Sequence, residues 1–234
     1  MRFKTVLFDL DGTLLPMDLN VFVSLYFKNL AIALSPYGYE PQKFVDNMWA
    51  SVAAMIKNDG NRTNEQVFWD NFVKLNSKNV LKDMPVFDAF YKNDFIKAKA
   101  ACGFSNQAAV VVRALRENGV RLVLATNPVF PAVATEQRIE WAGLEKTDFE
   151  LVTTYENSCY SKPNPDYYAE ILKKLDEKAE NCLMVGNDVD EDMVAENLGM
   201  KVFLLTDCLI NKNKRDISHY PQGSFQDLKA FLDI

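Results

Sequence analysis

Five short runs of apolar residues recur along the chain, and each is continuous instead of alternating between apolar and polar positions. They are Thr5–Leu10, Arg121–Thr126, Phe149–Thr154, Cys182–Val185 and Val202–Thr206. Strands that are buried on both faces have this pattern, and they belong to parallel sheets that helices cover on either side. The runs therefore predict five strands of a parallel sheet.

Helical patterns precede the second run and separate the later ones. They are Asn106–Asn118, Ala132–Ala142, Pro165–Leu175 and Asp190–Leu198. Three of them end at a glycine, the residue that most often follows a helix, and one begins with a proline, which suits the first helical position. Strands that alternate with helices in this way predict right-handed βαβ units and a doubly wound α/β sheet. The stretch Phe225–Leu232 predicts a closing amphipathic helix.

The block between the first and second runs contains no convincing strand. Its helical stretches are Leu19–Leu34, Gln42–Lys57, Asn64–Leu75 and Val86–Tyr91. We expect a helical domain over residues 17–99, inserted into a core formed by residues 1–16 and 100–234. Its many aromatic residues have two interpretations, because they either form the core between these helices or line a substrate pocket.

Composition limits the classes of partner. The chain has 234 residues and a net charge of −6, which argues against a nucleic-acid partner. Its four cysteines are scattered without paired spacing, so we expect free thiols in a reducing cytoplasm. The most apolar stretch, Val21–Leu34, is shorter than the ~20 residues that a membrane span needs. No secretory signal is apparent, and we expect no membrane partner.

Two acids follow the first apolar run directly. Asp9 and Asp11 are two positions apart, so in an extended chain their side chains point the same way, and Gly12 then permits a sharp turn. Ligands of open α/β sheets bind at the carboxyl ends of the strands, which is where these acids fall. Two adjacent carboxylates repel each other, and a divalent cation would remove that repulsion. The pattern predicts a metal site here.

The run FDLDGTL, which contains both acids, resembles motif I of the haloacid dehalogenase-like (HAD) superfamily. Three further segments resemble its other motifs in the right order: Leu124–Asn127 is similar to motif II, Ser161–Tyr168 to the KPxPxxY form of motif III, and Gly186–Asp192 to motif IV. The resemblance implies a Rossmann-like core. It also places a C1-type cap where residues 17–99 form the helical block.

The resemblance implies a Mg²⁺-dependent phosphomonoester hydrolase that forms an aspartyl-phosphate. Asp9 would be the nucleophile, and Asp11 would first act as general acid and then as general base. Thr126 and Lys162 complete the expected catalytic set, and Lys162 is held by flanking prolines as a point charge for the anion. The residues expected to bind the phosphate are Thr126, Asn127, Lys162, Gly12 and Thr13.

For the metal, the resemblance implies the Asp9 carboxylate, the backbone carbonyl of Asp11 and an acid of motif IV. Many family members carry an acid directly after the motif IV glycine, whereas this chain has Asn187 there. We therefore assign the direct ligand to Asp188. Asn187 either binds the metal through its amide oxygen or orients a metal-bound water, and Asp192 is expected to support the ligands from behind.

Two other functions remain open. A phosphosugar mutase would use the same core chemistry with a different acceptor, and a non-catalytic module that binds a metal or phosphometabolite is the interpretation that Asn187 favours. A dehalogenase of the superfamily is disfavoured, because those relatives lack the second acid of motif I, here Asp11. The expected partner is a small phosphorylated metabolite of unspecified identity, and the expected assembly is a monomer or weak homodimer.

Overall fold

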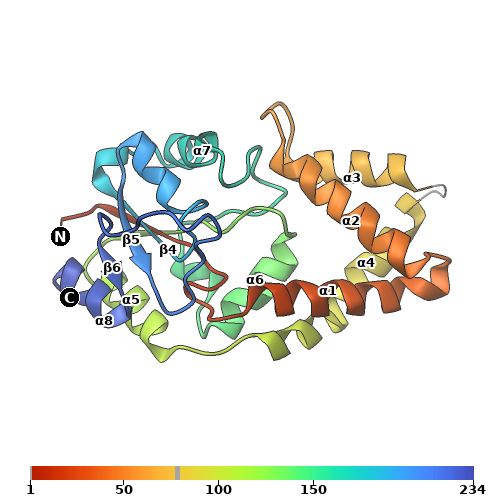
Figure 1. Ribbon diagram of the computed structural model, residues 1–234, viewed down its shortest axis with the longest axis horizontal. Helices are drawn as coiled ribbons and strands as arrows, with labels where there is room; N and C mark the ends of the chain where they lie inside the picture. Colours follow the sequence, from red (N-terminus) through yellow and green to blue (C-terminus); the bar gives the residue numbers. More distant parts are fainter. Residues whose placement is uncertain (1, 77–79) are drawn as a thin grey trace.

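The computed structural model describes residues 2–76 and 80–234, which fold into a sheet-containing core and a helical unit beside it (Figure 1). Within the described residues the core has one six-stranded parallel sheet, in the order β3-β2-β1-β4-β5-β6. Its strands are β1 (Thr5–Phe8), β2 (Arg121–Leu124), β3 (Leu151–Val152), β4 (Cys182–Gly186), β5 (Lys201–Leu205) and β6 (Gln222–Gly223).

All five predicted strands are present, and the doubly wound parallel sheet is confirmed. The structure adds β6, an edge strand of two residues that pairs with β5 and is too short to leave an apolar run. The third strand is also shorter than its predicted range, because only Leu151 and Val152 pair with β2. The prediction of five strands was therefore one short.

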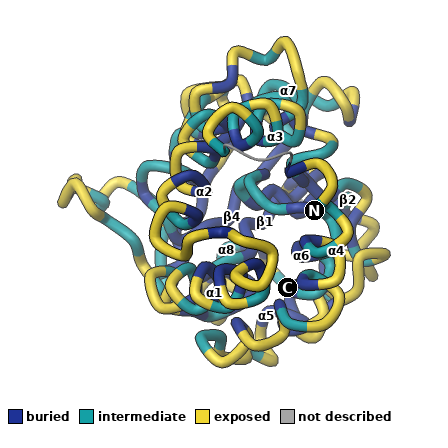
Figure 2. The backbone as a smooth tube through the Cα atoms, turned by 90° about the vertical axis from the view of Figure 1, so that its right-hand side faces the viewer, coloured by how far each residue is buried: buried dark blue, intermediate teal, exposed yellow. Residues whose placement is uncertain are grey.

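The sheet is covered on both faces by helices that the sequence pattern predicted. They are α5 (Asn106–Glu117), α6 (Ala132–Trp141), α7 (Pro165–Leu175) and α8 (Phe225–Leu232). Successive β1 side chains enter opposite cores: Val6 packs in the cluster that contains α5 and α8, and Leu7 in the cluster that contains α7. Figure 2 shows the backbone of β1 and β4 buried at the centre, as this two-sided packing requires.

One predicted helix is different in the structure. The segment from Asp190 is a turn, and only Met193–Leu198 is helical, as the 3₁₀ helix η6. The Asp188 carboxylate accepts hydrogen bonds from the Asp190 and Glu191 amides at 2.8 and 3.0 Å, which satisfies these donors outside a regular helix. The predicted α-helix over residues 190–198 was therefore wrong in type and in its first turn.

The helical unit contains α1 (Leu19–Leu34), α2 (Pro41–Ile56), α3 (Asn64–Leu75) and α4 (Met84–Asn93), with short 3₁₀ helices η1 (Ser35–Tyr37), η2 (Val80–Asp83) and η3 (Phe95–Ala101). The two connections to the core run side by side: Met17 and Cys102 form an antiparallel bridge, and the Gly103 amide donates to the Pro16 carbonyl at 2.7 Å. The chain thus leaves and re-enters the core at one place. The domain boundaries at residues 17 and 99 remain a prediction.

Helix α1 accounts for the most apolar stretch of the chain. Among the described residues, the segment Leu19–Tyr37 is long and apolar enough for a membrane span, a test that core helices of soluble proteins also pass. It is longer than the predicted stretch Val21–Leu34. Its side chains Phe22 and Leu30 are fully buried within the fold. Packing inside the protein buries 33% of this apolar window, while Val21 and Ile32 stay exposed.

Candidate active site

Asp9 and Asp11 follow β1 into a cavity of about 420 Å³, whose wall also contains Thr126 and Asp188. The Asp9 amide continues the pairing with β4 by donating to the Val185 carbonyl at 2.9 Å. The carboxyl ends of three neighbouring strands, β2, β1 and β4, meet at this cavity. The structure thus brings together predicted residues from motifs I, II and IV at the expected edge of the sheet.

Lys162 forms ion pairs with two of the acids. Its Nζ lies 2.8 Å from Asp9 Oδ1 and 2.6 Å from Asp192 Oδ1, and the lysine is almost fully buried. Burial alone would lower the pKa of Lys162, but the Asp192 and Asp9 carboxylates outweigh burial and raise it well above its ordinary value. Lys162 is therefore an ammonium group that holds the Asp9 carboxylate in place.

Asp11 has a partner that sequence reasoning missed. Its Oδ2 accepts a hydrogen bond from Arg138 Nη1, and Arg138 is fully buried on α6. Burial raises the pKa of Asp11, Arg138 lowers it, and Asp9 raises it again, so that the net direction is upward. The sequence offered little signal for this pair, because α6 mixes Glu136, Arg138 and Glu140 with apolar residues and its pattern does not show that Arg138 is buried.

The residues predicted to bind phosphate do not all reach the cavity. Thr126 and Asn127 line it, and the Asn127 side-chain amide donates to Glu191 Oε2 at 3.0 Å. Gly12, Thr13 and Lys162 are not among the residues that line it. Contact of these three residues with a phosphate group remains a prediction.

The motif IV residues have distinct surroundings. Asp188 lines the cavity, and its Oδ2 accepts no hydrogen bond from any residue that the structure describes. Asn187 is engaged at both ends, since its Oδ1 accepts from Thr13 Oγ1 at 2.9 Å and its Nδ2 donates to the Cys208 carbonyl at 2.7 Å. Asp192 Oδ2 accepts from the Asp188 amide at 2.9 Å. The last contact lets Asp192 position the Asp188 backbone.

The oxygen atoms at this site fit Mg²⁺ by their chemistry. In residues 2–76 and 80–234 no group of three or more His, Cys, Asp or Glu side chains forms a metal cluster. The predicted set needs only two carboxylates, however, because Asp11 would contribute its backbone carbonyl while its carboxylate pairs with Arg138. Mg²⁺ usually keeps several waters and takes one or two protein carboxylates. Asp9 and Asp188 suit that requirement.

Glu191 is a further acid in the cavity, and the sequence analysis assigned it no role. Burial raises the pKa of Glu191, and Lys162 opposes this shift. Its backbone carbonyl accepts a hydrogen bond from Tyr168 Oη at 2.9 Å, which fixes the segment after β4 against α7. Because acidic side chains outnumber basic ones in the cavity wall, we expect a cation to bind there before an anionic ligand does.

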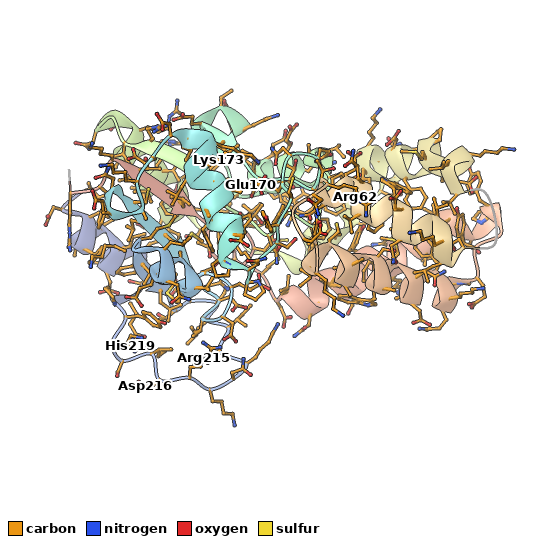
Figure 3. The ribbon with its side chains drawn as sticks, turned by 90° about the horizontal axis from the view of Figure 1, so that it is seen from above. Arg62, Glu170, Lys173, Arg215, Asp216 and His219 are labelled. Atoms are coloured by element: carbon orange, nitrogen blue, oxygen red, sulfur yellow. The ribbon has the colours of Figure 1, made fainter. Side chains whose placement is uncertain are left out.

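A loop between β5 and β6 adds one cation to the cavity wall. Lys212 on this loop lines the cavity, and its neighbour Arg215 forms an ion pair with Asp190 at 2.7 Å. Figure 3 shows Arg215, Asp216 and His219 on the same loop, which projects from the core. All three are exposed, and the single histidine of the chain, His219, is not among the residues that line the cavity.

The fold, the three motifs at the ends of β1, β2 and β4 and the motif that begins α7 define a hydrolase of the HAD type. Residues 3–199 match the family model of the haloacid dehalogenase-like hydrolases, and the chain therefore belongs to that family. The resemblance stated from the motifs is confirmed, as is the expectation that the protein is an enzyme. The roles of individual residues are not tested by this match.

The relatives are distant but cover most of the chain. Pyrophosphatase PpaX of Bacillus cereus is 25% identical over 202 residues, which is 86% of this chain and 82% of that protein. The structure of a predicted phosphoglycolate phosphatase of Haemophilus somnus is 21% identical, covers 99% of both chains and has a TM-score of 0.58. That of the HAD-hydrolase YfnB of Bacillus subtilis, bound to magnesium, is 16% identical, covers 100% of both chains and has a TM-score of 0.57.

Proposed function

We propose that the protein is a Mg²⁺-dependent phosphomonoester hydrolase that acts on a small phosphorylated metabolite through an aspartyl-phosphate. The observation that carries this proposal is the Asp9 carboxylate, held at 2.8 Å by the buried Lys162 ammonium and facing the same cavity as Asp11. A nucleophile and an acid–base group thus stand together. Relatives named as a pyrophosphatase and a phosphoglycolate phosphatase support a substrate with a phosphate group.

The chain's own residues support both chemical steps. Asp9 attacks phosphorus, the bond to the leaving oxygen breaks, and Asp11 gives that oxygen its proton. Asp11 then takes a proton from a water that attacks the phosphorylated Asp9, which releases phosphate and restores the carboxylate. The raised pKa of Asp11 favours the protonated form that the first step needs. Mg²⁺, held by Asp9, Asp188 and the Asp11 carbonyl, would neutralise charge on the phosphate.

The remaining features of the proposal come from the sequence. They are a cytoplasmic location, a monomer or weak homodimer, and the absence of nucleic-acid and membrane partners. A phosphosugar mutase would share Asp9 and Asp11 and differ only in the acceptor of the phosphoryl group. The test below therefore measures released phosphate and not only loss of substrate.

The test compares phosphate release from p-nitrophenyl phosphate by the wild type and by Asp9→Asn, each with Mg²⁺ and with EDTA. We expect Mg²⁺-dependent release by the wild type and a fall of at least about 10³-fold in kcat for the variant. Asp46→Asn changes an exposed acid on α2 and is the matched control, with an unchanged rate. Equal rates for Asp9→Asn and wild type would refute the nucleophile. Phosphosugar isomerisation without free phosphate would replace the hydrolase with a mutase.

A further inference from the structure

A second cavity lies between the helical unit and the core. It adjoins the cavity that Asp9 and Asp11 line, which we call the catalytic cavity in keeping with the proposed function. The volume of the second cavity is about 80 Å³, and every lining residue is aliphatic, aromatic, methionine or proline. Aromatic side chains form most of the wall, among them Phe27 and Phe68 from the helical unit and Phe130 from the core. No charged residue lines it within the described part of the chain. We call it the apolar cavity.

The apolar cavity and the catalytic cavity share part of their walls. The residues that line both are Val23, Trp49, Val52, Val129 and Phe130. A molecule whose phosphate group lies against Asp9 would therefore meet these side chains with the part beyond the phosphate. In a phosphomonoester that part is the leaving group. The position of the apolar cavity thus corresponds to the leaving-group side of the proposed reaction.

The helical unit offers no positive charge to an anionic leaving group, the main alternative class. Where the helical unit lines the catalytic cavity, its side chains are uncharged, and only Asn20 and Ser24 are polar. The nearest buried cations are already paired, Lys162 with two acids and Arg138 with Asp11. A carboxylate or second phosphate placed on this side would be desolvated with no cation from the helical unit, which disfavours its binding.

Trp49 gives the shared wall its affinity for apolar groups. This side chain is 50% exposed although it packs edge-on against Phe27 with ring centroids 5.0 Å apart. Covering exposed apolar surface of this kind releases water and favours binding. An anionic ligand would gain nothing from that burial.

We propose that the substrate has an uncharged, largely apolar leaving group, a short alkyl chain or an aryl ring, which binds at this shared wall. The inference rests on the proposed function, because it names the substrate class of the same site. It separates this enzyme from one that hydrolyses pyrophosphate or phosphoglycolate. Specificity would arise from the aromatic surface of the helical unit.

The first experiment compares kcat/KM with Mg²⁺ for benzyl phosphate, 2-phosphoglycolate and pyrophosphate. We expect benzyl phosphate to exceed the two anionic substrates by at least about tenfold, since the helical unit has no cation for their second anionic group and Lys212 lies on the loop between β5 and β6. A higher value for phosphoglycolate or pyrophosphate would overturn the substrate class and leave the hydrolase standing.

The second experiment places a charge on the shared wall. Val52→Lys should lower kcat/KM for benzyl phosphate by at least about tenfold, mainly through KM, and should leave or raise the value for phosphoglycolate. Ala50→Lys adds the same charge to an exposed position of α2 outside both cavities and should change neither substrate. Trp49→Lys repeats the test at a half-exposed position, in case Val52→Lys fails to fold. An unchanged preference in the folded variants contradicts the inference.

Binding separates the two proposals. The Kd values of benzyl phosphate and 2-phosphoglycolate are measured by calorimetry on Asp9→Asn with Mg²⁺. Tighter binding of benzyl phosphate supports the apolar site even if the wild type releases no phosphate from any substrate, a result that would overturn the hydrolase alone. Equal or weaker binding of benzyl phosphate overturns the apolar site, whatever the rate of phosphate release.

Discussion

Asn187 has a structural use that a carboxylate could not fill. Its amide accepts from Thr13 with Oδ1 and donates to the Cys208 carbonyl with Nδ2, so it ties the turn after β1 to the loop after β5. An aspartate has no donor for Cys208. The departure from the family pattern at this position thus accompanies a hydrogen bond that an aspartate could not donate, and Asp188 remains the proposed metal ligand.

Gly12 is constrained by this asparagine. It has a φ of +88°, and a Cβ atom added to it would lie 2.3 Å from Asn187 Nδ2. Two separate effects therefore favour glycine here: the left-handed backbone conformation and the close approach of the amide. The turn that carries Asp11 depends on both.

Gly12→Ala should lower the free energy of unfolding by more than Gly38→Ala. Gly38 has a similar φ of +82° but nothing within 4 Å of an added Cβ, so it measures backbone strain alone, about 1–2 kcal/mol. The excess at Gly12 reports the clash with Asn187. Urea denaturation of both variants gives the comparison, and equal losses would show that Asn187 moves aside freely.

At the level of elements, an ion pair fastens β3 to β2 at the edge of the sheet. Arg121 Nε and Nη2 donate to the two oxygens of Glu150 at 2.8 and 2.6 Å. Arg121 Nη2 also donates to the Leu175 carbonyl at the end of α7, at 3.0 Å. The pair compensates for the shortness of β3, which contributes only two paired residues.

This ion pair should make a pH-dependent contribution to stability. The hydrogen bond from Arg121 lowers the pKa of Glu150 below its ordinary value of 4.5. The ion pair therefore stabilises the fold fully above pH 4.5 and loses this contribution as the pH falls through the lowered pKa. A double-mutant cycle with Arg121→Met and Glu150→Gln should give about 0.2–1 kcal/mol at pH 7, because both side chains are partly exposed. The coupling should weaken as the pH falls through the lowered pKa of Glu150, and a pH-independent coupling energy would contradict this assignment.

The elements that the sequence predicted best are those whose burial is uniform. β1, β2, β4 and β5 appear as continuous apolar runs because both of their faces are covered. β6 could not be predicted, because it has two half-buried residues and pairs only through its backbone. The start of the helix expected from Asp190 was lost because the Asp188 carboxylate accepts hydrogen bonds from the Asp190 and Glu191 amides, which competes locally with helix formation.

The site was predictable where motifs fall at strand ends and unpredictable where it depends on packing between elements. Asp9, Asp11, Thr126 and Asp188 reach one cavity because parallel strands end at the same edge. The contact of Arg138 with Asp11 depends on which face of α6 meets the turn after β1, and one helix pattern does not specify that. A buried arginine shows that a partner exists without naming it.

At the level of the whole molecule, the two parts divide the proposed work. Every residue assigned to the chemistry lies in the core, and the helical unit contributes the apolar side chains around the leaving group. Figure 1 shows this unit on the opposite side of the core from both chain termini. Substitutions on α1 and α2 should therefore change substrate preference more than the rate of the chemical steps.

Mg²⁺ binding should raise the thermal stability of the whole chain. At 100 times its Kd, a ligand that binds only the folded state adds about 2.7 kcal/mol, or about 5–10 °C in Tm for a chain of this size. Asp188→Asn keeps the side-chain acceptor for the Asp190 amide and should lose most of the shift. Asp190→Asn is the control. The Asp190 carboxylate accepts a hydrogen bond at 2.7 Å from the side-chain amide of Asn213, which lies on the projecting loop. Equal shifts in both variants would remove Asp188 from the metal site.

The Arg138 guanidinium lies 4.3 Å from the centroid of the Phe130 ring, and Phe130 lines both cavities. One aromatic ring is therefore in contact with the space for the leaving group and with the cation that holds Asp11. A bulky group that displaces this ring would also displace the guanidinium, and with it the Asp11 carboxyl that is proposed to deliver the proton. Compounds of the wrong shape would then be turned over slowly even when they bind well. Substrate selection would therefore act on the rate of the chemical step as well as on binding.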